Sequence, residues 1–285
     1  MAYIQWYPGH IAKAERKLKE LVNLVDVVIE VIDARIPLSS KYANIDKIIG
    51  NKPRLLILNK SDLGDSLCID KWIDYYKKEL KIPVITTSSN SNKDISSVVS
   101  NAIEVGKLKI ESLVAKGLLP RPTRAVVIGM PNVGKSSIIN KLIKKAKVKV
   151  GAKAGVTRTS QWVRVHPRLE LLDTPGIIPM KLDDQEAAVK LAVVNSVSEN
   201  AYDYVEVAED LMNIIYSLYP KNLIENYKLQ NIEGNPTLDD IAVSRNWILP
   251  GQEPDTKRAA SMLLADFRHA RIGRLNLDPP PQIED

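Results

Sequence analysis

One short segment limits the folds open to this chain more than any other feature. Residues 129–136 read Gly-Met-Pro-Asn-Val-Gly-Lys-Ser, which is the pattern Gly-x-x-x-x-Gly-Lys-Ser of a phosphate-binding loop. Its glycines let the backbone curl around phosphate oxygens, so that N–H groups and the start of the next helix point at the anion. An apolar run at 125–128 precedes the loop, and helical periodicity follows it at 135–145. This context predicts an α/β domain built around a phosphate site.

Two side chains of the loop have defined chemistry. Lys135 is expected to reach the β- and γ-phosphates of a nucleotide and to act in catalysis, and the Ser136 hydroxyl is expected to coordinate Mg²⁺. The neighbouring residues predicted to contact the nucleotide are Asn132, Val133, Gly134 and Ser137.

A second motif indicates which base is bound. The sequence Asn59-Lys60-Ser61-Asp62 follows an apolar run at 55–58. The Asp62 carboxylate can accept both N–H donors on the guanine edge, and adenine offers no such pair. Ser88 and Ser89 follow a third apolar run, at 83–86, and are expected to present backbone donors to the guanine O6, although the loop departs from the usual Ser-Ala-Lys.

A third motif, Asp-x-x-Gly at residues 173–176, follows the apolar segment 169–172. Asp173 is expected to hold Mg²⁺ through water, and the Gly176 N–H is expected to sense the γ-phosphate. Thr157 lies between the two phosphate motifs and is the predicted switch threonine, with capping or solvation as its alternative role. The predicted metal-binding set is therefore Ser136, Thr157 and Asp173.

The order of these motifs is rotated. In an ordinary GTPase the phosphate loop comes first and the base-recognition motifs come last, whereas here residues 59–62 precede residues 129–136. Residues 116–122 contain one glycine and two prolines, so this segment is the expected connector between the original ends. The motifs predict a circularly permuted P-loop GTPase domain with a mostly parallel, doubly wound sheet.

From about residue 182 onward the periodicity is helical. The last strong helix is predicted at 255–271, and its exposed face is expected to carry Lys257, Arg258, Arg268 and Arg271. We therefore predict a GTPase domain with an N-terminal helix at 1–180 and a helical, RNA-binding domain at 181–285. Basic side chains contact nucleic acid phosphates without reading sequence, and a solvated helix face is the alternative.

Composition narrows the cellular setting. The single cysteine, Cys68, cannot form an internal disulfide, which favours a reducing compartment. No apolar run approaches the roughly 18 residues that a membrane span requires, and the N-terminus lacks the layout of a signal peptide. We expect a cytoplasmic protein without a membrane anchor. The formal net charge of +6 favours polyanionic partners without identifying one.

With these motifs in place, the chain resembles the circularly permuted GTPases of the YlqF/RbgA-like family of large-ribosomal-subunit assembly factors. The resemblance covers nearly the whole chain. It includes the segment Trp-Tyr-Pro-Gly-His-Ile at 6–11, Asp-Ala-Arg at 33–35 and Gly-Arg-Leu at 273–275. It implies GTP hydrolysis, slow without ribosomal stimulation, coupled to maturation of the large-subunit precursor, with rRNA contacts from the helical domain of a monomeric protein.

The resemblance also implies roles for two residues. Ile177 follows Asp-x-x-Gly, where a Ras-like protein carries a water-orienting glutamine, and the family assigns that role to the histidine that corresponds to His10. Capping of the first helix is the alternative for His10. Asn132 resembles the asparagine through which related GTPases use K⁺, with a turn-forming role as the alternative. The expected ligands are thus GTP or GDP, Mg²⁺ and K⁺.

Two other functions stay open at this level. An RNA scaffold could bind GTP with negligible hydrolysis, and a GTP-dependent RNA-modifying enzyme would need an added catalytic cluster. The helical half of the sequence offers no cluster of Cys, His or carboxylate residues for such chemistry.

Overall fold

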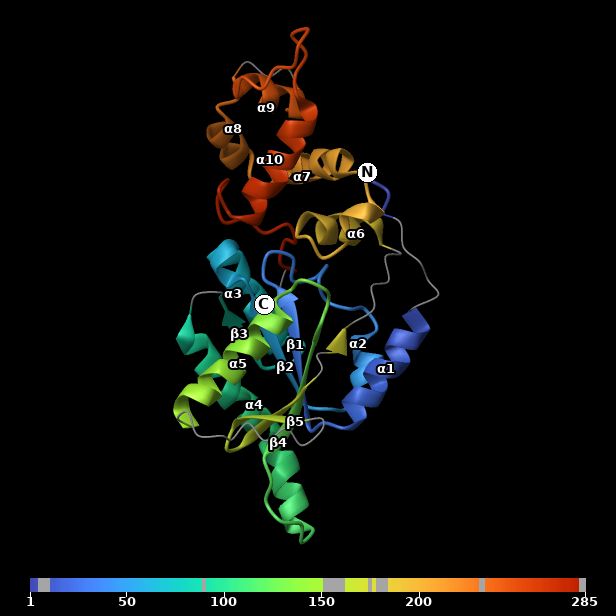
Figure 1. Cartoon of the computed structure of the whole chain (residues 1–285), viewed down its shortest axis with the longest axis vertical. Coiled ribbons are helices and arrows are strands. Elements are labelled where there is room, and N and C mark those ends of the chain that lie inside the picture. The colour runs from blue at the N-terminus through green and yellow to red at the C-terminus, as the bar shows by residue number, and fades with distance from the viewer. Residues whose placement is uncertain are drawn as a thin grey trace.

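The computed structural model describes residues 1–4, 11–88, 91–150, 162–173, 176–177, 184–230 and 234–281. Figure 1 shows two parts, a sheet with flanking helices below and a group of helices above. We refer to them as the sheet region and the helical region.

The described strands form one seven-stranded sheet in which β4 and β1 are central. The order along the sheet is β3-β2-β1-β4-β6-β5, with β7 pairing with the end of β4. All pairs are parallel except β5 with β6. The strands are β1 (Val27–Asp33), β2 (Arg54–Asn59), β3 (Val84–Thr87), β4 (Thr123–Gly129), β5 (Trp162–His166), β6 (Leu169–Leu172) and β7 (Gly176–Ile177).

The central strands are apolar on both faces because helices cover both. Every residue of β1 is buried, as expected for a β-branched strand inside a parallel sheet. On one face lie α1 (Ile11–Asn23), α2 (Ile45–Ile49) and α3 (Ser66–Lys78), and α3 packs its Trp72 against Ile32 and Leu58. On the other face lie α4 (Asn92–Ala115) and α5 (Lys135–Val150). In α4, Gly106 approaches Val27 of β1 so closely that an added Cβ would lie 2.9 Å from its methyl group.

The helical region contains α6 (Gln185–Val193), α7 (Tyr204–Leu218), α8 (Pro220–Tyr227), α9 (Leu238–Ser244) and α10 (Thr256–Arg268). Side-chain caps fix several helix starts, among them Asp203 on α7 and a capping box at Thr237 on α9. Leu263 and Phe267 of α10 are buried in the core of this region. Residues 1–4 also contact this region, because the Ala2 N–H donates to Asp210 of α7 over 2.6 Å.

The fold class predicted from the motifs is confirmed, since the rotated motifs lie on one mostly parallel sheet. The apolar runs at 55–58 and 125–128 lie in β2 and β4, and the connector at 116–122 separates α4 from β4. The predicted boundary between residues 180 and 181 lies outside the described residues, so the two-domain division stays a prediction.

One part of the predicted basic face is wrong. Arg268 is half-buried, and its guanidinium donates to the Val193 carbonyl over 2.8 Å and to the Ala192 carbonyl over 3.2 Å. These carbonyls end α6, where a cation is favoured because the last carbonyls of a helix lack partners within it. Arg268 therefore holds α6 against α10, whereas Lys257 and Arg258 are exposed as predicted.

Candidate functional site

The sheet order itself marks a ligand-binding crevice. From β1 the chain adds β2 and β3 on one side, and it then returns to place β4 on the other side of β1. In open α/β sheets, ligands bind outside the carboxyl ends of the strands at such a reversal. The loops that follow β1, β2 and β4 all begin at this edge, so the phosphate loop and the base-recognition motif open toward the same crevice.

Two glycines of the phosphate loop are required by close approach. Gly129 lies so near β1 that a Cβ would be 2.4 Å from the Val31 carbonyl oxygen. At Gly134 the φ angle is +103°, and a Cβ would lie 2.1 Å from Nδ2 of Asn59. Residues with side chains are strained in this conformation and would displace Asn59. The glycines of the sequence motif therefore let the loop pack tightly against its neighbours.

Asn59 joins the two motifs. Its Nδ2 donates to the Val133 carbonyl of the phosphate loop over 2.7 Å, and its Oδ1 accepts from the Thr87 hydroxyl over 2.8 Å. The side chain thus connects the end of β2, the end of β3 and a loop more than 70 residues downstream. Sequence reasoning missed Thr87, whose buried hydroxyl completes the connection and which is paired with Asn59 in the sheet register.

Lys135 is buried at the first position of α5. Its Nζ donates to the Met130 carbonyl of the same loop over 2.5 Å. Burial lowers the pKa of the Lys135 ammonium from its ordinary value of 10.5 to about 8. A nucleotide phosphate would supply negative charge beside this ammonium.

Lys60 is held in place by the carboxylate that ends β1. It has a left-handed backbone conformation, with φ of 61°, and its Nζ lies 2.9 Å from Oδ2 of Asp33. The Arg35 guanidinium binds the same carboxylate through Nε and Nη2, over 2.9 and 2.8 Å. These two cations outweigh the cost of burial and lower the pKa of Asp33 to about 2. Asp33 therefore stays ionised and fixes both basic side chains.

Asp62 lies in a short 3-10 helix, η2 (Ser61–Leu63), between β2 and α3. The Ser61 hydroxyl donates to the Thr87 carbonyl over 3.2 Å, which holds this turn against the end of β3. Ser88 follows β3, and its N–H donates to the Asp94 carboxylate of α4 over 2.8 Å. The structure thus brings Asp62 and Ser88 to the same edge, while Ser89 lies outside the described residues.

Two of the three predicted metal-binding residues, Ser136 and Asp173, lie in the described part of the chain. Ser136 is exposed in the first turn of α5, and Asp173 is exposed at the end of β6. The strands that precede these two residues, β4 and β6, are neighbours in the sheet. A hydroxyl and a carboxylate together provide oxygen ligands that suit Mg²⁺. Gly176 pairs with Ile128 of β4, which brings the Asp-x-x-Gly motif beside the phosphate loop. Thr157 and His10 lie outside the described residues.

Asn132 connects the phosphate loop with the helical region. Its φ is 57°, its side chain is exposed, and its Nδ2 donates to the Asn195 carbonyl over 2.6 Å. Asn195 follows the end of α6, the same helix end that Arg268 holds. The helical region therefore touches the phosphate loop directly. Ser137 is exposed one position after Ser136.

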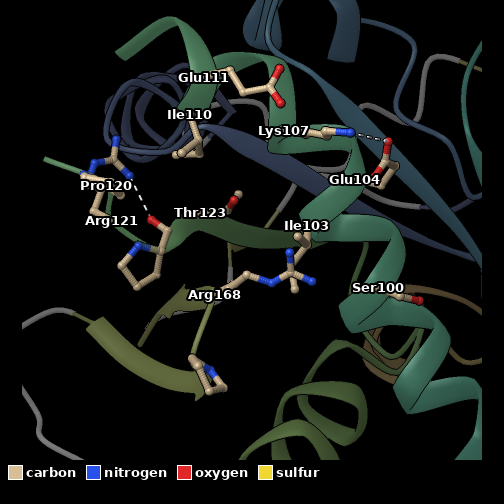
Figure 2. Close-up of a pocket in the computed structure, with 12 residues that line it drawn as sticks. Ser100, Ile103, Glu104, Lys107, Ile110, Glu111, Pro120, Arg121, Thr123 and Arg168 are labelled. Carbon is tan, nitrogen blue, oxygen red and sulfur yellow. Dashed lines mark hydrogen bonds and ion pairs between the residues drawn. The ribbon is translucent and has the colours of Figure 1, made fainter. Parts of the chain in front are cut away.

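A second pocket lies at the amino ends of the strands, on the side of the sheet opposite the crevice. Figure 2 shows this pocket of about 630 Å³ between α4, the connector before β4 and the turn between β5 and β6. Its lining includes Ile103, Lys107 and Arg168. Because Thr123 and Arg168 stand at the amino ends of β4 and β6, the pocket is separate from the crevice that the motifs share.

The phosphate loop, the guanine motif and the reversal of the sheet order define a P-loop GTPase with rotated motif order. A family model described as "50S ribosome-binding GTPase" matches residues 124–232, beginning in the strand that leads into the phosphate loop. Ribosome biogenesis GTPase A of Bacillus cereus is 37% identical over 99% of this chain and 97% of its own length. The protein of the same name from Thermotoga maritima is 31% identical over 98% of this chain and 96% of its own. The chain belongs to this ribosome biogenesis GTPase A (YlqF/RbgA) family.

Solved structures agree with this assignment. GNP-bound YlqF from T. maritima is similar with a TM-score of 0.66 and 26% identity, covering 95% of this chain and 100% of that one. A GDP-bound structure of TM YlqF has a TM-score of 0.67 and 27% identity, covering 93% and 99%. The protein is accordingly a GTP-binding hydrolase that functions in ribosome biogenesis. In the described part of the chain, none of the helices is both long and apolar enough for a membrane span.

Proposed function

We propose that the protein is a GTP-driven switch that acts on the precursor of the large ribosomal subunit, with the crevice at the carboxyl ends of β1, β2 and β4 as its nucleotide site. The observation that carries the proposal is the 2.7 Å hydrogen bond from Asn59 to the Val133 carbonyl. It joins a base-recognition motif to a phosphate loop, so that one ligand with a guanine base and phosphates can contact both.

Each site residue has a role that follows from its position. Asp62 accepts the two N–H donors of guanine, and Lys135 pairs with the β- and γ-phosphates. The N–H groups from Val133 to Ser137 are donors for the phosphate oxygens, as expected at the start of a helix. Ser136, Thr157 and Asp173 would hold Mg²⁺, which would supply positive charge against the negative charge that develops on the phosphates.

Hydrolysis requires a group that orients water. Ile177 stands where a Ras-like protein has glutamine and offers no polar atom, and His10 takes this role in the proposal. We expect His10→Ala to leave GTP affinity within about twofold while lowering stimulated turnover by about 100-fold, the lower end of the range for general acid–base groups. Equal turnover of the variant and the wild type would contradict the assignment.

A potassium ion held by Asn132 would place positive charge near the β/γ bridge, which is the work of an arginine finger. In this role the Oδ1 of Asn132 would bind the ion, while its Nδ2 donates to the Asn195 carbonyl. Turnover is expected to be faster in K⁺ than in Na⁺ at the same ionic strength. Identical rates would remove K⁺ from the proposal.

Contact with rRNA is assigned to the helical region. Lys257 and Arg258 are exposed on α10, and the Arg258 guanidinium lies 5.0 Å from the centre of the Trp247 ring. An arginine beside a partly exposed aromatic ring can bind a phosphate and stack on an unpaired base. The proposal includes a monomeric, cytoplasmic protein with a GTPase domain at 1–180 and an RNA-binding domain at 181–285.

The direct test is GTP turnover with and without purified large ribosomal subunits. Strong stimulation by large subunits, and none by small subunits, is the expected result. A protein that binds GTP and large subunits with unstimulated, negligible hydrolysis would instead be an RNA scaffold. Failure to bind large subunits in the presence of a GTP analogue would contradict the proposed partner.

A further inference from the structure

The chain that follows α10 returns to the sheet and contacts the loops of the nucleotide crevice. Figure 1 shows this segment (red) descending from the helical region. We call Asn276, Leu277 and Asp278 the C-terminal strap. All three residues are buried, each with an exposed fraction of 1%, although the sequence gives them no obvious partner. Two of them are polar, and buried polar side chains are normally hydrogen-bonded.

Asn276 uses both ends of its amide to bridge two loops of the sheet region. Its Nδ2 donates to the Ala34 carbonyl, in the loop after β1, over 2.7 Å. Its Oδ1 accepts from the Asp65 N–H, in the loop after β2, over 2.8 Å. Gly64 makes room for this contact, since a Cβ there would lie 2.8 Å from the same Oδ1. Asn276 thus ties the loop after β1 to the loop after β2, and the second of these carries Asp62.

The rest of the strap fixes the first of these loops. The Leu277 N–H donates to the Arg35 carbonyl over 2.9 Å. The Asp278 carboxylate accepts from the Leu38 and Ser39 N–H groups over 2.9 and 2.7 Å, and it pairs with Lys190 of α6 at 3.1 Å. Asn276 is thus anchored in a rigid, fully bonded segment.

The contact with Asp65 bears on guanine recognition because Asp62 lies in the turn just before it. The upstream end of this turn is fixed by Asn59, and by Lys60 through its ion pair with Asp33. At the downstream end, the Asp65 side chain caps α3 while its N–H is held by Asn276. The carboxylate of Asp62 is therefore carried by a short turn that is tied at both ends.

The strap is also tied to the helical region. The Asn276 N–H donates to the Tyr219 hydroxyl at the end of α7 over 3.3 Å. Arg35, in the loop that the strap covers, lies 5.4 Å from the centre of the Phe267 ring in α10. A shift of α7 and α10 relative to the sheet would consequently pull on the same turn that carries Asp62.

We propose that Asn276 is a positioning residue for guanine recognition, which holds the turn of Asp62 from the helical side of the crevice. This inference rests on the assignment of Asp62 as the acceptor for the base. Asn276 touches neither nucleotide nor reacting atoms, and it acts through Asp65. Base selectivity in this chain then depends on the placement of a segment from the far end of the sequence.

The test compares GDP with inosine diphosphate, which lacks the 2-amino group that Asp62 accepts. Loss of one buried hydrogen bond to the turn predicts that Asn276→Ala binds GDP about tenfold more weakly, while inosine diphosphate weakens by less than about threefold. The preference for GDP over inosine diphosphate therefore falls. A merely structural role of Asn276 would weaken both nucleotides equally or lower only the melting temperature.

Asn222→Ala is the matched control, because that amide donates to the Ile272 carbonyl within the helical region over 3.1 Å. The control is expected to keep the wild-type preference. Gly64→Ala disturbs the same contact from the sheet side and provides a second variant if Asn276→Ala folds poorly; it should lower the preference in the same direction.

An unchanged preference in both Asn276→Ala and Gly64→Ala overturns the inference. Asp62→Asn separates this outcome from failure of the proposed site. If Asp62→Asn abolishes the preference while the other two variants keep it, the base site stands and only the role of Asn276 fails. If Asp62→Asn binds both nucleotides like the wild type, the assignment of the base site fails first.

Discussion

Binding of a nucleotide should draw a proton onto Lys135. The buried ammonium has a pKa of about 8 in the nucleotide-free protein, against an ordinary value of 10.5. The phosphates supply negative charge beside it and should raise its pKa, because an opposite charge nearby favours the charged form. At pH 8 half of the protein carries a neutral Lys135, so each binding event is expected to take up roughly half a proton.

The direction and the size of the pH dependence follow from the difference between the folded-state and unfolded-state pKa of Lys135. A folded-state pKa below the unfolded one means that burial of the ammonium opposes folding below pH 8, by roughly 3 kcal/mol, and that this penalty fades as the pH rises toward 10.5. Nucleotide binding offsets the penalty. GDP affinity should therefore be nearly constant below about pH 7 and should fall by up to about tenfold per pH unit above pH 8.

Isothermal titration with GDP at pH 8, in excess Mg²⁺, measures the proton directly. The observed enthalpies in Tris and in HEPES differ by the number of protons taken up times the difference between the ionisation enthalpies of the two buffers. Lys144→Met, which removes an exposed lysine of the same helix, should leave the uptake unchanged. No uptake at pH 8, or release of protons, would refute a buried Lys135 as the phosphate-binding cation.

Three further results are expected. Asn59→Ala leaves the Val133 carbonyl and the Thr87 hydroxyl without their bonds to this side chain, and should lower the free energy of unfolding in urea by about 2 to 4 kcal/mol; a change below about 0.5 kcal/mol would contradict the bridging role. Gly134→Ala should abolish measurable GDP binding while the protein stays folded by circular dichroism, since its Cβ would lie 2.1 Å from Asn59; retained affinity would show that the loop can adapt. Because the pKa of Asp33 is lowered to about 2 from 3.8, its contribution of roughly 2 kcal/mol is present above pH 4 and is lost as the pH falls toward 2; in urea unfolding the wild type should lose more stability than Asp33→Asn between pH 5 and pH 3, and parallel losses would count against the buried ion pairs.

The elements with the strongest local patterns were predictable from sequence. The strand at 27–33 is β-branched at every position except Glu30 and Asp33, and a strand buried on both faces is typically rich in such residues. The strand β5 (Trp162–His166) was not predicted, because it lies at the antiparallel edge and alternates between buried and exposed positions over a short length. The 24-residue helix α4 was also missed, since its N-terminal half is rich in serine and its apolar stripe is weak.

Among the site residues too, those in local motifs were predictable and those that depend on distant partners were not. Motif chemistry predicted Lys135 and Asp62, because their roles are tied to a fixed local spacing. Thr87 and Asn276 could not be found in this way, since each depends on a partner brought close only by the folded sheet: Asn276 and Asp65 are 211 positions apart in the chain. A single asparagine in a tail carries no periodicity or spacing that would mark it as a bridge.

The contacts between the sheet region and the helical region add a structural consequence to the rotated motif order. From sequence, the rotation placed the helical half directly after Asp-x-x-Gly. In the structure the helical region also touches the phosphate loop at Asn132, and the strap covers the loop after β1. The phosphate end and the base end of a bound nucleotide would therefore both lie near residues whose positions depend on α6 and α10.

If the two motifs in rotated order form one guanine-nucleotide site, the base specificity of the protein must depend on Asp62. Asp62→Asn replaces an acceptor with an amide that can donate to the extra carbonyl of xanthine. We expect the GDP affinity of Asp62→Asn to fall by at least about 100-fold, the equivalent of two charge-assisted hydrogen bonds. Xanthosine diphosphate should become the preferred ligand of this variant. Unchanged GDP affinity, with xanthosine diphosphate still excluded, would contradict a shared site.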